Sequence, residues 1–213
     1  MKINLLIFSV FFTLSHVSSA GDWPGWRGEE RNDVSKETGL LQSWPEGGPE
    51  NLWVIKLGGL GDSGFSIADD RLFTLGAFGK EEKLLAFNAS TGKKAWELTT
   101  GELLTNNWGD GPRMTPSVSN GLVYALGGRG NLVCADAKTG KQQWKVHLVK
   151  DLGGKVPGWG YTESVLIDQG RVICTPGGSN GALAALDAKS GEVLWRSKEF
   201  TDGAQYSSLI VRE

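Results

Sequence analysis

A cassette of about ten residues occurs three times in this chain and constrains its fold more than any other feature. The copies lie at 87–96, 135–144 and 186–195. In each copy, Gly lies four residues before a Trp, and Asn or Asp lies eight residues before it. The Trp-to-Trp distance is 48 residues and then 51. A constant core with connectors of variable length is typical of a repeated supersecondary unit that stacks on its neighbours.

The residue types of the cassette predict a β-hairpin. An Asn or Asp side chain can hydrogen-bond to the backbone two residues on, which starts a turn. Gly adopts the positive φ that closes a short hairpin. Apolar residues precede the turn, and Trp ends the strand that follows it. The Gly and Trp pairs of the three copies are Gly92 and Trp96, Gly140 and Trp144, and Gly191 and Trp195.

A second hairpin is expected upstream of each cassette. Its turns are predicted at Asp69-Asp70, at Asn120-Gly121 and between Asp168 and Gly170, each between two apolar stretches. Asn-Gly in such a setting is the strongest short hairpin signal. Two hairpins per repeat make a four-stranded meander of about 45 residues, which is typical of a propeller blade.

The cassettes also carry a resemblance to a known family. The pattern Asp-x-x-(Thr/Ser)-Gly-(Lys/Glu)-x-x-Trp occurs in full in the second and third copies, and the first copy has Asn88 in place of Asp. On this pattern, residues 50–213 resemble the PQQ-repeat (quinoprotein-like) β-propeller family, in which it is called the tryptophan-docking motif. The same motif builds enzymes and non-enzymatic scaffolds, so the resemblance implies the fold more than the activity.

The expected fold is all-β, a β-propeller of four-stranded antiparallel blades, here an incomplete arc of about three full blades plus flanking strands. The blades are expected at about 64–98, 115–148 and 163–197, and a fourth begins at about 205. An outer strand at 51–57, which carries Trp53, is expected before the first blade. Because propellers usually have four to eight blades, we expect the chain to be the N-terminal part of a longer protein.

Residues 1–20 are typical of a signal peptide. Lys2 precedes an apolar run at 3–14, and Ser18-Ser19-Ala20 supplies the small residues of a cleavage site. The run is short for a bilayer span, so we expect cleavage after Ala20, a periplasmic or secreted protein and no transmembrane segment afterwards; the alternative is an uncleaved anchor. Residues 21–49 form a Gly/Pro/Trp-rich lead whose Trp side chains are expected to pack on a propeller face or rim.

Composition excludes some classes of function. Hydrophobic residues make up 39% of the chain and the net charge is −2, which favours neither disorder nor nucleic-acid binding. Cys134 and Cys174 are either two buried thiols or a disulfide of an exported protein. Their positions in different repeats do not decide between the two, because sequence alone does not give the distance between their Cα atoms.

Candidate site residues come from the loops that precede the first strand of each blade, because these loops gather on one face of a propeller. The four channel-face loops are 61–65, 106–113, 157–163 and 202–206. Trp159, Tyr161 and Trp108 are candidates to stack a flat or sugar-like ligand, and Arg113 is a candidate to bind a carboxylate. Asp110 and Glu163 are candidates to ligate a hard cation or to act as a base. The structural alternative is ordinary turns, aromatic side chains that fill the channel, and an Arg113–Asp110 pair.

The function expected from these features is binding or scaffolding, with a small-molecule or envelope-protein partner on the channel face. The family resemblance implies two alternatives: a PQQ-dependent oxidoreductase of alcohols or sugars with PQQ and calcium, and a scaffold for outer-membrane protein assembly. The sequence contains no adjacent cysteine pair, no metal-ligand cluster at diagnostic spacing and no nucleophile motif. It therefore names no catalytic residue and no metal ligand, and it leaves open whether the protein is an enzyme.

Overall fold

The computed structural model describes residues 21–56 and 58–212. The regular structure within these ranges is entirely β, with strands and no helix. The expected signal peptide, at 1–20, lies outside the described residues. Across the part of the chain that is described, no helix has the length and apolar character needed to cross a membrane.

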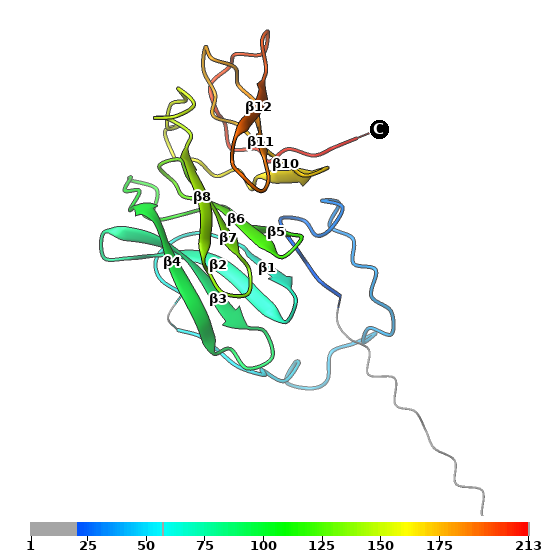
Figure 1. Ribbon diagram of the computed structural model, residues 1–213. Helices are drawn as coiled ribbons and strands as arrows, with labels where there is room; N and C mark the ends of the chain where they lie inside the picture. The colour runs from blue at the N-terminus through cyan, green and yellow to red at the C-terminus, as the bar shows by residue number, and fades with distance from the viewer. Residues whose placement is uncertain (1–20, 57, 213) are drawn as a thin grey trace, which may run out of the picture.

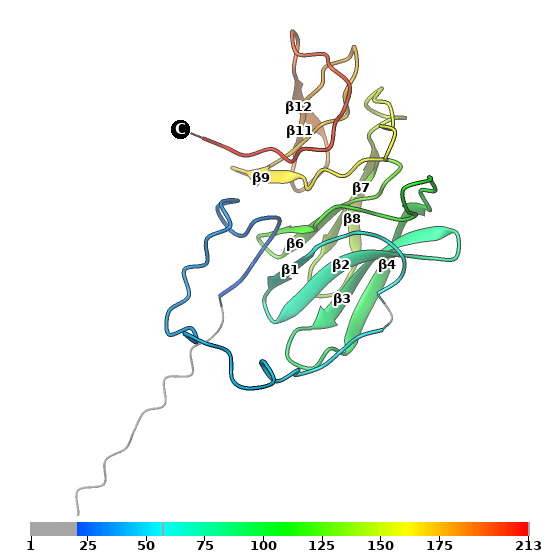
Figure 2. The same cartoon turned by 180° about the vertical axis from the view of Figure 1, so that it is seen from behind.

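The strands form three four-stranded sheets, each an antiparallel meander in chain order. Figures 1 and 2 show the sheets following one another in an arc that is not closed, which confirms the expected all-β, incomplete propeller. The strands of sheet 1 are β1 (Phe65–Ala68), β2 (Arg71–Phe78), β3 (Glu81–Asn88) and β4 (Lys94–Glu102). Those of sheet 2 are β5 (Ser117–Ser119), β6 (Leu122–Leu126), β7 (Asn131–Asp136) and β8 (Gln142–His147). Those of sheet 3 are β9 (Leu166–Asp168), β10 (Arg171–Cys174), β11 (Ala184–Asp187) and β12 (Val193–Arg196).

The first hairpin of each sheet closes through two residues with positive φ. These pairs are Asp69-Asp70, Asn120-Gly121 and Gln169-Gly170. Positive φ at both central residues matches the right-handed twist of the flanking strands. The third turn is therefore one residue tighter than the sequence indicated, because Asp168 belongs to β9 and pairs with Arg171 of β10.

The cassette turn is the second hairpin of each sheet, and it curls like the start of a helix. In the second copy, the Gly140 N–H donates to the Asp136 carbonyl at 2.8 Å, and the Thr139 N–H donates to the Asp136 carboxylate at 2.7 Å. The side-chain bond thus reaches three residues on, as at a helix N-cap, rather than only two as predicted. The first copy does the same through Asn88, and the third through Asp187, whose carboxylate also accepts from Lys189.

The cassette Trp joins each sheet to the next one. The Trp96 indole N–H donates to the Ala137 carbonyl at 3.1 Å, and a Cβ added to Gly140 would lie 2.6 Å from the Trp96 ring. The other contacts of this kind join Trp53 to Ala89 and Gly92, and Trp144 to Ala188 and Gly191. The Trp ring therefore occupies the space that is free because Gly has no side chain.

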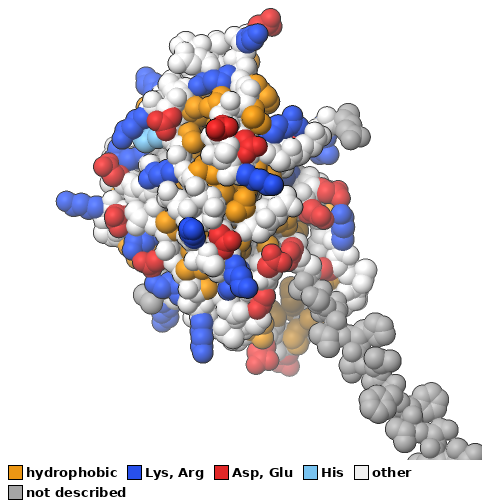
Figure 3. Space-filling view, in the orientation of Figure 1, with side chains coloured by type: hydrophobic (Ala, Val, Ile, Leu, Met, Phe, Trp, Pro, Cys, Tyr) orange, Lys and Arg blue, Asp and Glu red, His pale blue; other side chains and the backbone are white. Residues whose placement is uncertain are grey.

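The hydrophobic core lies between the sheets. Phe73 of sheet 1, Leu132 of sheet 2 and Leu186 of sheet 3 are fully buried. Cys134 and Cys174 are buried free thiols, so they are not bridged. Hydrophobic side chains also gather at the surface over β11 and β12 (Figure 3), where Val193, Leu194 and Trp195 are exposed. The Trp195 ring is 40% exposed, in contrast to Trp144 at 7%.

Two segments that are expected to be strands pair with none of the strands in the three sheets. Residues 51–56 form no strand, although Trp53 contacts the Gly92 turn of sheet 1 in the way that Trp96 contacts the Gly140 turn of sheet 2. Residues 205–212 also form no strand. A strand needs a neighbouring strand to take its backbone hydrogen bonds, and within the described residues no strand pairs with either segment.

The lead follows the inner edge of the arc. Trp23 exchanges two backbone hydrogen bonds with Ile67 of β1, at 2.8 and 2.9 Å. The Val118 N–H of β5 donates to the Pro24 carbonyl at 2.7 Å. The lead therefore adds backbone contacts along the first strands of sheets 1 and 2.

Candidate functional site

Hydroxyl side chains tie successive repeats together where each first strand begins. The Thr115 N–H donates to the Ser164 hydroxyl at 2.9 Å, and the Ser164 N–H donates to the Ser208 hydroxyl at 2.9 Å. Ser208 therefore holds the same place in the segment after sheet 3 as Ser164 holds before β9. These bonds bring the channel-face loops to one face of the arc.

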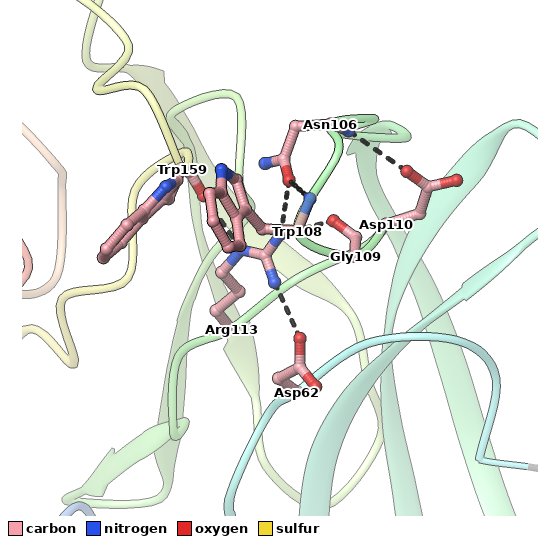
Figure 4. A network of polar contacts seen from close by, with 7 residues as sticks. All are labelled: Asp62, Asn106, Trp108, Gly109, Asp110, Arg113 and Trp159. Carbon is pink, nitrogen blue, oxygen red and sulfur yellow. Dashed lines mark hydrogen bonds and ion pairs between the residues drawn. The ribbon is translucent and has the colours of Figure 1, made fainter.

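Arg113 connects three of these loops through one guanidinium group. Its Nη1 donates to the Asp62 carboxylate at 2.7 Å, and its Nε donates to the Trp159 carbonyl at 2.8 Å. Its Nη2 donates to the Gly109 carbonyl and lies 3.4 Å from the Asn106 side-chain oxygen. Figure 4 shows the guanidinium between these groups. Because its donors point at protein acceptors, Arg113 holds the loops in place.

Asp110 does not pair with Arg113. Its carboxylate accepts the Asn106 N–H at 3.1 Å, and the Asn106 side chain in turn accepts the Trp108 N–H at 2.8 Å. Figure 4 shows Asp110 on the far side of Asn106 from the guanidinium. Asp110 thus shapes its own loop, and the partner of Arg113 is Asp62 from the preceding repeat.

Trp108, Trp159 and Tyr206 form an aromatic row on this face. The Trp159 and Tyr206 rings are stacked, with centroids 4.7 Å apart and an interplanar angle of 26°. Trp108 meets Trp159 edge-on at 5.9 Å. The exposed fraction is 75% for Trp108, 44% for Trp159 and 38% for Tyr206. Each ring comes from a different channel-face loop, so the row exists only in the folded chain.

The other two sequence candidates are buried away from the row. Tyr161 is 1% exposed, and its hydroxyl donates to the Pro176 carbonyl at 3.0 Å. Glu163 is 2% exposed, and its carboxylate accepts the Thr175 N–H and hydroxyl at 2.8 and 2.9 Å. Burial raises the pKa of Glu163 to about 7, against the opposing effect of the Thr175 hydrogen bonds and the Arg31 charge. Both side chains are therefore buried inside the arc, where they hydrogen-bond to other residues of the chain.

A polar cleft of about 670 Å³ adjoins the aromatic row. Tyr206 belongs to the aromatic row and also lines the cleft. Asp62 and Arg113 line the cleft where it meets the row. Most of its other polar lining consists of hydroxyl groups, from Thr115, Thr162, Ser164, Ser207 and Ser208, and Trp26 and Arg27 of the lead complete it. In residues 21–56 and 58–212, no group of three or more His, Cys, Asp or Glu side chains is placed to hold a metal ion.

Sequence reasoning did not identify Arg31 of the lead, which the structure places among the interior contacts. Its guanidinium is 8% exposed and donates to the carbonyls of Ser164 and Leu209, at 3.0 and 2.8 Å, and of Val165. Burial lowers its pKa to about 10. Arg31 stands in a polar stretch with no periodicity, so only the folded chain identifies its partners.

Comparisons with known proteins agree with this architecture. A PQQ-repeat family model, described as outer membrane protein assembly factor BamB, matches residues 80–212, more than half of the chain. The dehydrogenase subunit of the quinone alcohol dehydrogenase of Gluconacetobacter polyoxogenes is 33% identical over 120 residues, which cover 52% of this chain and 16% of that protein. The polyvinylalcohol dehydrogenase of Sphingopyxis sp. (strain 113P3) is 26% identical over 197 residues, which cover 84% of this chain and 29% of that protein.

The chain spans less than a third of the length of either relative. Among solved structures, a europium-containing methanol dehydrogenase matches with a TM-score of 0.58 and 18% identity, over 84% of this chain and 32% of that one. This likeness shows a shared fold. Together with the three cassettes and the family match, it leads to one conclusion: the chain belongs to the PQQ-repeat family of β-propellers.

Proposed function

We propose that this chain is the binding or scaffold part of an exported PQQ-repeat propeller, and that its ligand or partner contacts the channel face. The observation that carries the proposal is the Arg113 network. One guanidinium fixes loops from three successive repeats, and the result is a row of exposed aromatic rings beside a polar cleft. Exposed aromatic side chains held in place by the fold are typical of recognition surfaces.

An envelope location fits the same proposal. The family model carries the description of an outer-membrane protein assembly factor, and the first residues read as a signal for export. A partner in the periplasm or at the outer membrane would meet the channel face as a rigid surface. In this proposal, the repeats form a tryptophan-docking framework that supports the channel face. Its contacts are those of Gly92, Gly140 and Gly191, each with a Trp that lies earlier in the chain.

Hydrogen exchange would test where such a partner binds. We would compare amide exchange of the full chain with and without an envelope extract of its own organism. The expected result is slower exchange at 106–113 and 157–162, and its loss in Trp159→Ala. Trp44→Ser is the matched control, since Trp44 is 71% exposed and lies outside the cleft. Protection confined to other segments, or none at all, would contradict the proposal.

A quinone-dependent dehydrogenase is the second candidate, supported by the 33% identity to a quinone alcohol dehydrogenase subunit. The described residues do not by themselves fit a calcium-bound quinone. Asp62 is the only carboxylate among the described residues that line the cleft, and it is paired with Arg113. No catalytic residue follows from this cleft. Saturable binding of PQQ with calcium, followed by tryptophan fluorescence and visible absorbance, would favour this candidate over the first.

A further inference from the structure

The aromatic row runs directly into the polar cleft, and this continuity limits the chemistry of the ligand. Trp159 stacks on Tyr206, and Tyr206 also lines the cleft. A ligand on this face therefore meets flat apolar rings at one end and hydroxyl groups at the other. The cleft volume of about 670 Å³ lies within the range of about 300–1,000 Å³ usual for small-molecule sites.

The row is fixed before any ligand arrives. The Trp159 carbonyl accepts from Arg113 at 2.8 Å, and the Trp159 N–H lies 3.4 Å from the Tyr206 hydroxyl oxygen. The Trp108 N–H is held by the Asn106 side chain at 2.8 Å. A ligand that stacks on these rings would therefore lose little free energy to ordering the loops.

The cleft offers both donors and acceptors for hydroxyl groups. Each Ser or Thr hydroxyl has one donor and two acceptor positions, and the bonds within the protein leave some of them free. The Ser164 and Ser208 oxygens accept one backbone N–H each, from Thr115 and Ser164. The Asp62 side chain is 68% exposed beside them, although one of its oxygens binds Arg113.

Charge argues for a neutral ligand. Both guanidinium groups at the cleft are already paired with carboxylates of this chain. Arg113 lies 2.7 Å from Asp62, and Arg27 lies 2.5 Å from Asp33. A polyanionic ligand would have to displace these partners, and the negative charge of Asp62 would repel it.

We propose that the aromatic row and the adjoining cleft bind a neutral carbohydrate chain. A pyranose ring has one face of C–H groups, which suits Trp108 and Trp159, and a rim of hydroxyl groups, which suits Asp62 and the Ser and Thr side chains. Trp159 and Tyr206 cover one face of each other and Trp108 meets Trp159 edge-on, so a sugar would contact the remaining exposed faces and edges of the row. Because the row continues into the cleft through Tyr206, a chain of linked sugars can contact both, which a single sugar cannot. The inference rests on the proposed binding function and names its ligand class.

Titration with defined neutral hexasaccharides tests this inference. Cellohexaose, maltohexaose, xylohexaose and fully N-acetylated chitohexaose would be added to the full chain, and binding would be followed by tryptophan fluorescence and calorimetry. We expect at least one to bind saturably, with a Kd of about 1 mM or below. Trp159→Ala should weaken that binding at least about tenfold, whereas Trp44→Ser should leave the Kd unchanged. An anionic hexagalacturonate should bind more weakly than the best neutral chain.

Two results would overturn the carbohydrate assignment. One is the lack of saturable binding of all four hexasaccharides by a chain whose near-ultraviolet circular dichroism shows native packing. The other is binding that survives Trp159→Ala unchanged. If envelope extract still protects the channel-face loops in either case, the carbohydrate inference fails and the proposed function stands. If the extract gives no protection either, both fail.

Discussion

At the scale of single residues, buried charged groups hold distant parts of the chain together. The Glu82 carboxylate accepts the Leu104 N–H at 3.0 Å and the Gly128 N–H at 2.8 Å, so it joins sheet 1 to sheet 2. Burial raises its pKa, and the two backbone bonds oppose that effect. Arg31 acts similarly, because it binds carbonyls more than 100 residues away. Glu163 instead binds Thr175 of its own repeat. Each group is stable in the interior because the folded chain supplies its hydrogen bonds.

Removing the Arg31 guanidinium should be strongly destabilising. Arg31→Ala leaves the Ser164, Val165 and Leu209 carbonyls without this donor, so we expect a loss of about 3 kcal/mol in the free energy of unfolding. Urea denaturation followed by tryptophan fluorescence measures it. Arg27→Ala is the control, because its pair with Asp33 is partly exposed and should contribute about 1 kcal/mol or less. Equal effects of the two changes would contradict the bridging role of Arg31.

Glu163 should make the protein less stable as pH rises. Burial raises its folded-state pKa from 4.5 to about 7, so between these values the folded state holds more protons than the unfolded state. The contribution of this group is therefore greatest below about pH 4.5 and falls as pH increases to about 7, by at most on the order of 3 kcal/mol.

Glu163→Gln should remove that part of the pH dependence. The amide can still hydrogen-bond to Thr175 but does not titrate, so its urea midpoint should change less between pH 5 and pH 8 than that of the unchanged protein. Glu192→Gln, at an exposed turn position, should keep the original slope. If Glu163→Gln also kept it, another group would have to be responsible.

At the scale of elements, the cassette both closes a hairpin turn and contacts the Trp of the preceding repeat. Gly140 has φ of 73°, which closes the turn, and its missing side chain makes room for Trp96 of the preceding sheet. A register shift in the strand pairing precedes the turn in all three sheets. The same few residues thus end one strand pair and position the neighbouring sheet.

Two glycines with the same φ allow these two roles to be tested separately. Gly121 also has φ of 73°, but an added Cβ there would meet nothing within 4 Å. Gly121→Ala should cost about 1 kcal/mol, the strain of a left-handed residue. Gly140→Ala should cost about 2 kcal/mol more, because the Trp96 ring must move and loses its bond to Ala137. Urea denaturation would show this difference, and equal losses would contradict the contact role of the cassette Gly.

At the scale of the whole molecule, the arc brings loops from successive repeats to one face. Asp62 precedes sheet 1, Arg113 precedes sheet 2 and Trp159 precedes sheet 3, yet they form one network. The backbone-to-hydroxyl bonds of Thr115, Ser164 and Ser208 set the spacing of these loops. The candidate site is therefore a property of the stacking of the repeats.

Loss of Arg113 should loosen this face without unfolding the arc. In Arg113→Ala, amides at 106–111 and at 159 should exchange at least about fivefold faster, since a network worth about 1 kcal/mol is gone. Amides of the buried strand β7 should not change. Arg129→Ala is the control, because Arg129 is exposed and its Nε donates at 2.8 Å to the Leu103 carbonyl, which lies before the amides at 106–111. Unchanged exchange in Arg113→Ala would refute the role of Arg113 in holding the loops.

The sequence alone determined the repeat, the all-β fold class and the turn positions to within one residue. These depend on short patterns such as Asn120-Gly121 and the Gly–Trp spacing, because backbone conformation at a turn is decided by a few neighbouring residues. The sequence also indicated the loops that would face the channel, and it selected Arg113 and Trp159 within them. These turn and loop patterns each lie within a few consecutive residues, so they can be recognised without knowing which distant residues are in contact.

Only the tertiary structure decided which partner each side chain meets. It paired Arg113 with Asp62 rather than Asp110, buried Tyr161 and Glu163, and brought Tyr206 to Trp159. It also placed Arg31 against Ser164, although no local pattern distinguishes this arginine. The segments at 51–56 and 205–212 form no strand for the same reason. Hydrogen-bond partners, burial and strand pairing depend on residues far away in the sequence, which become neighbours only when the sheets stack.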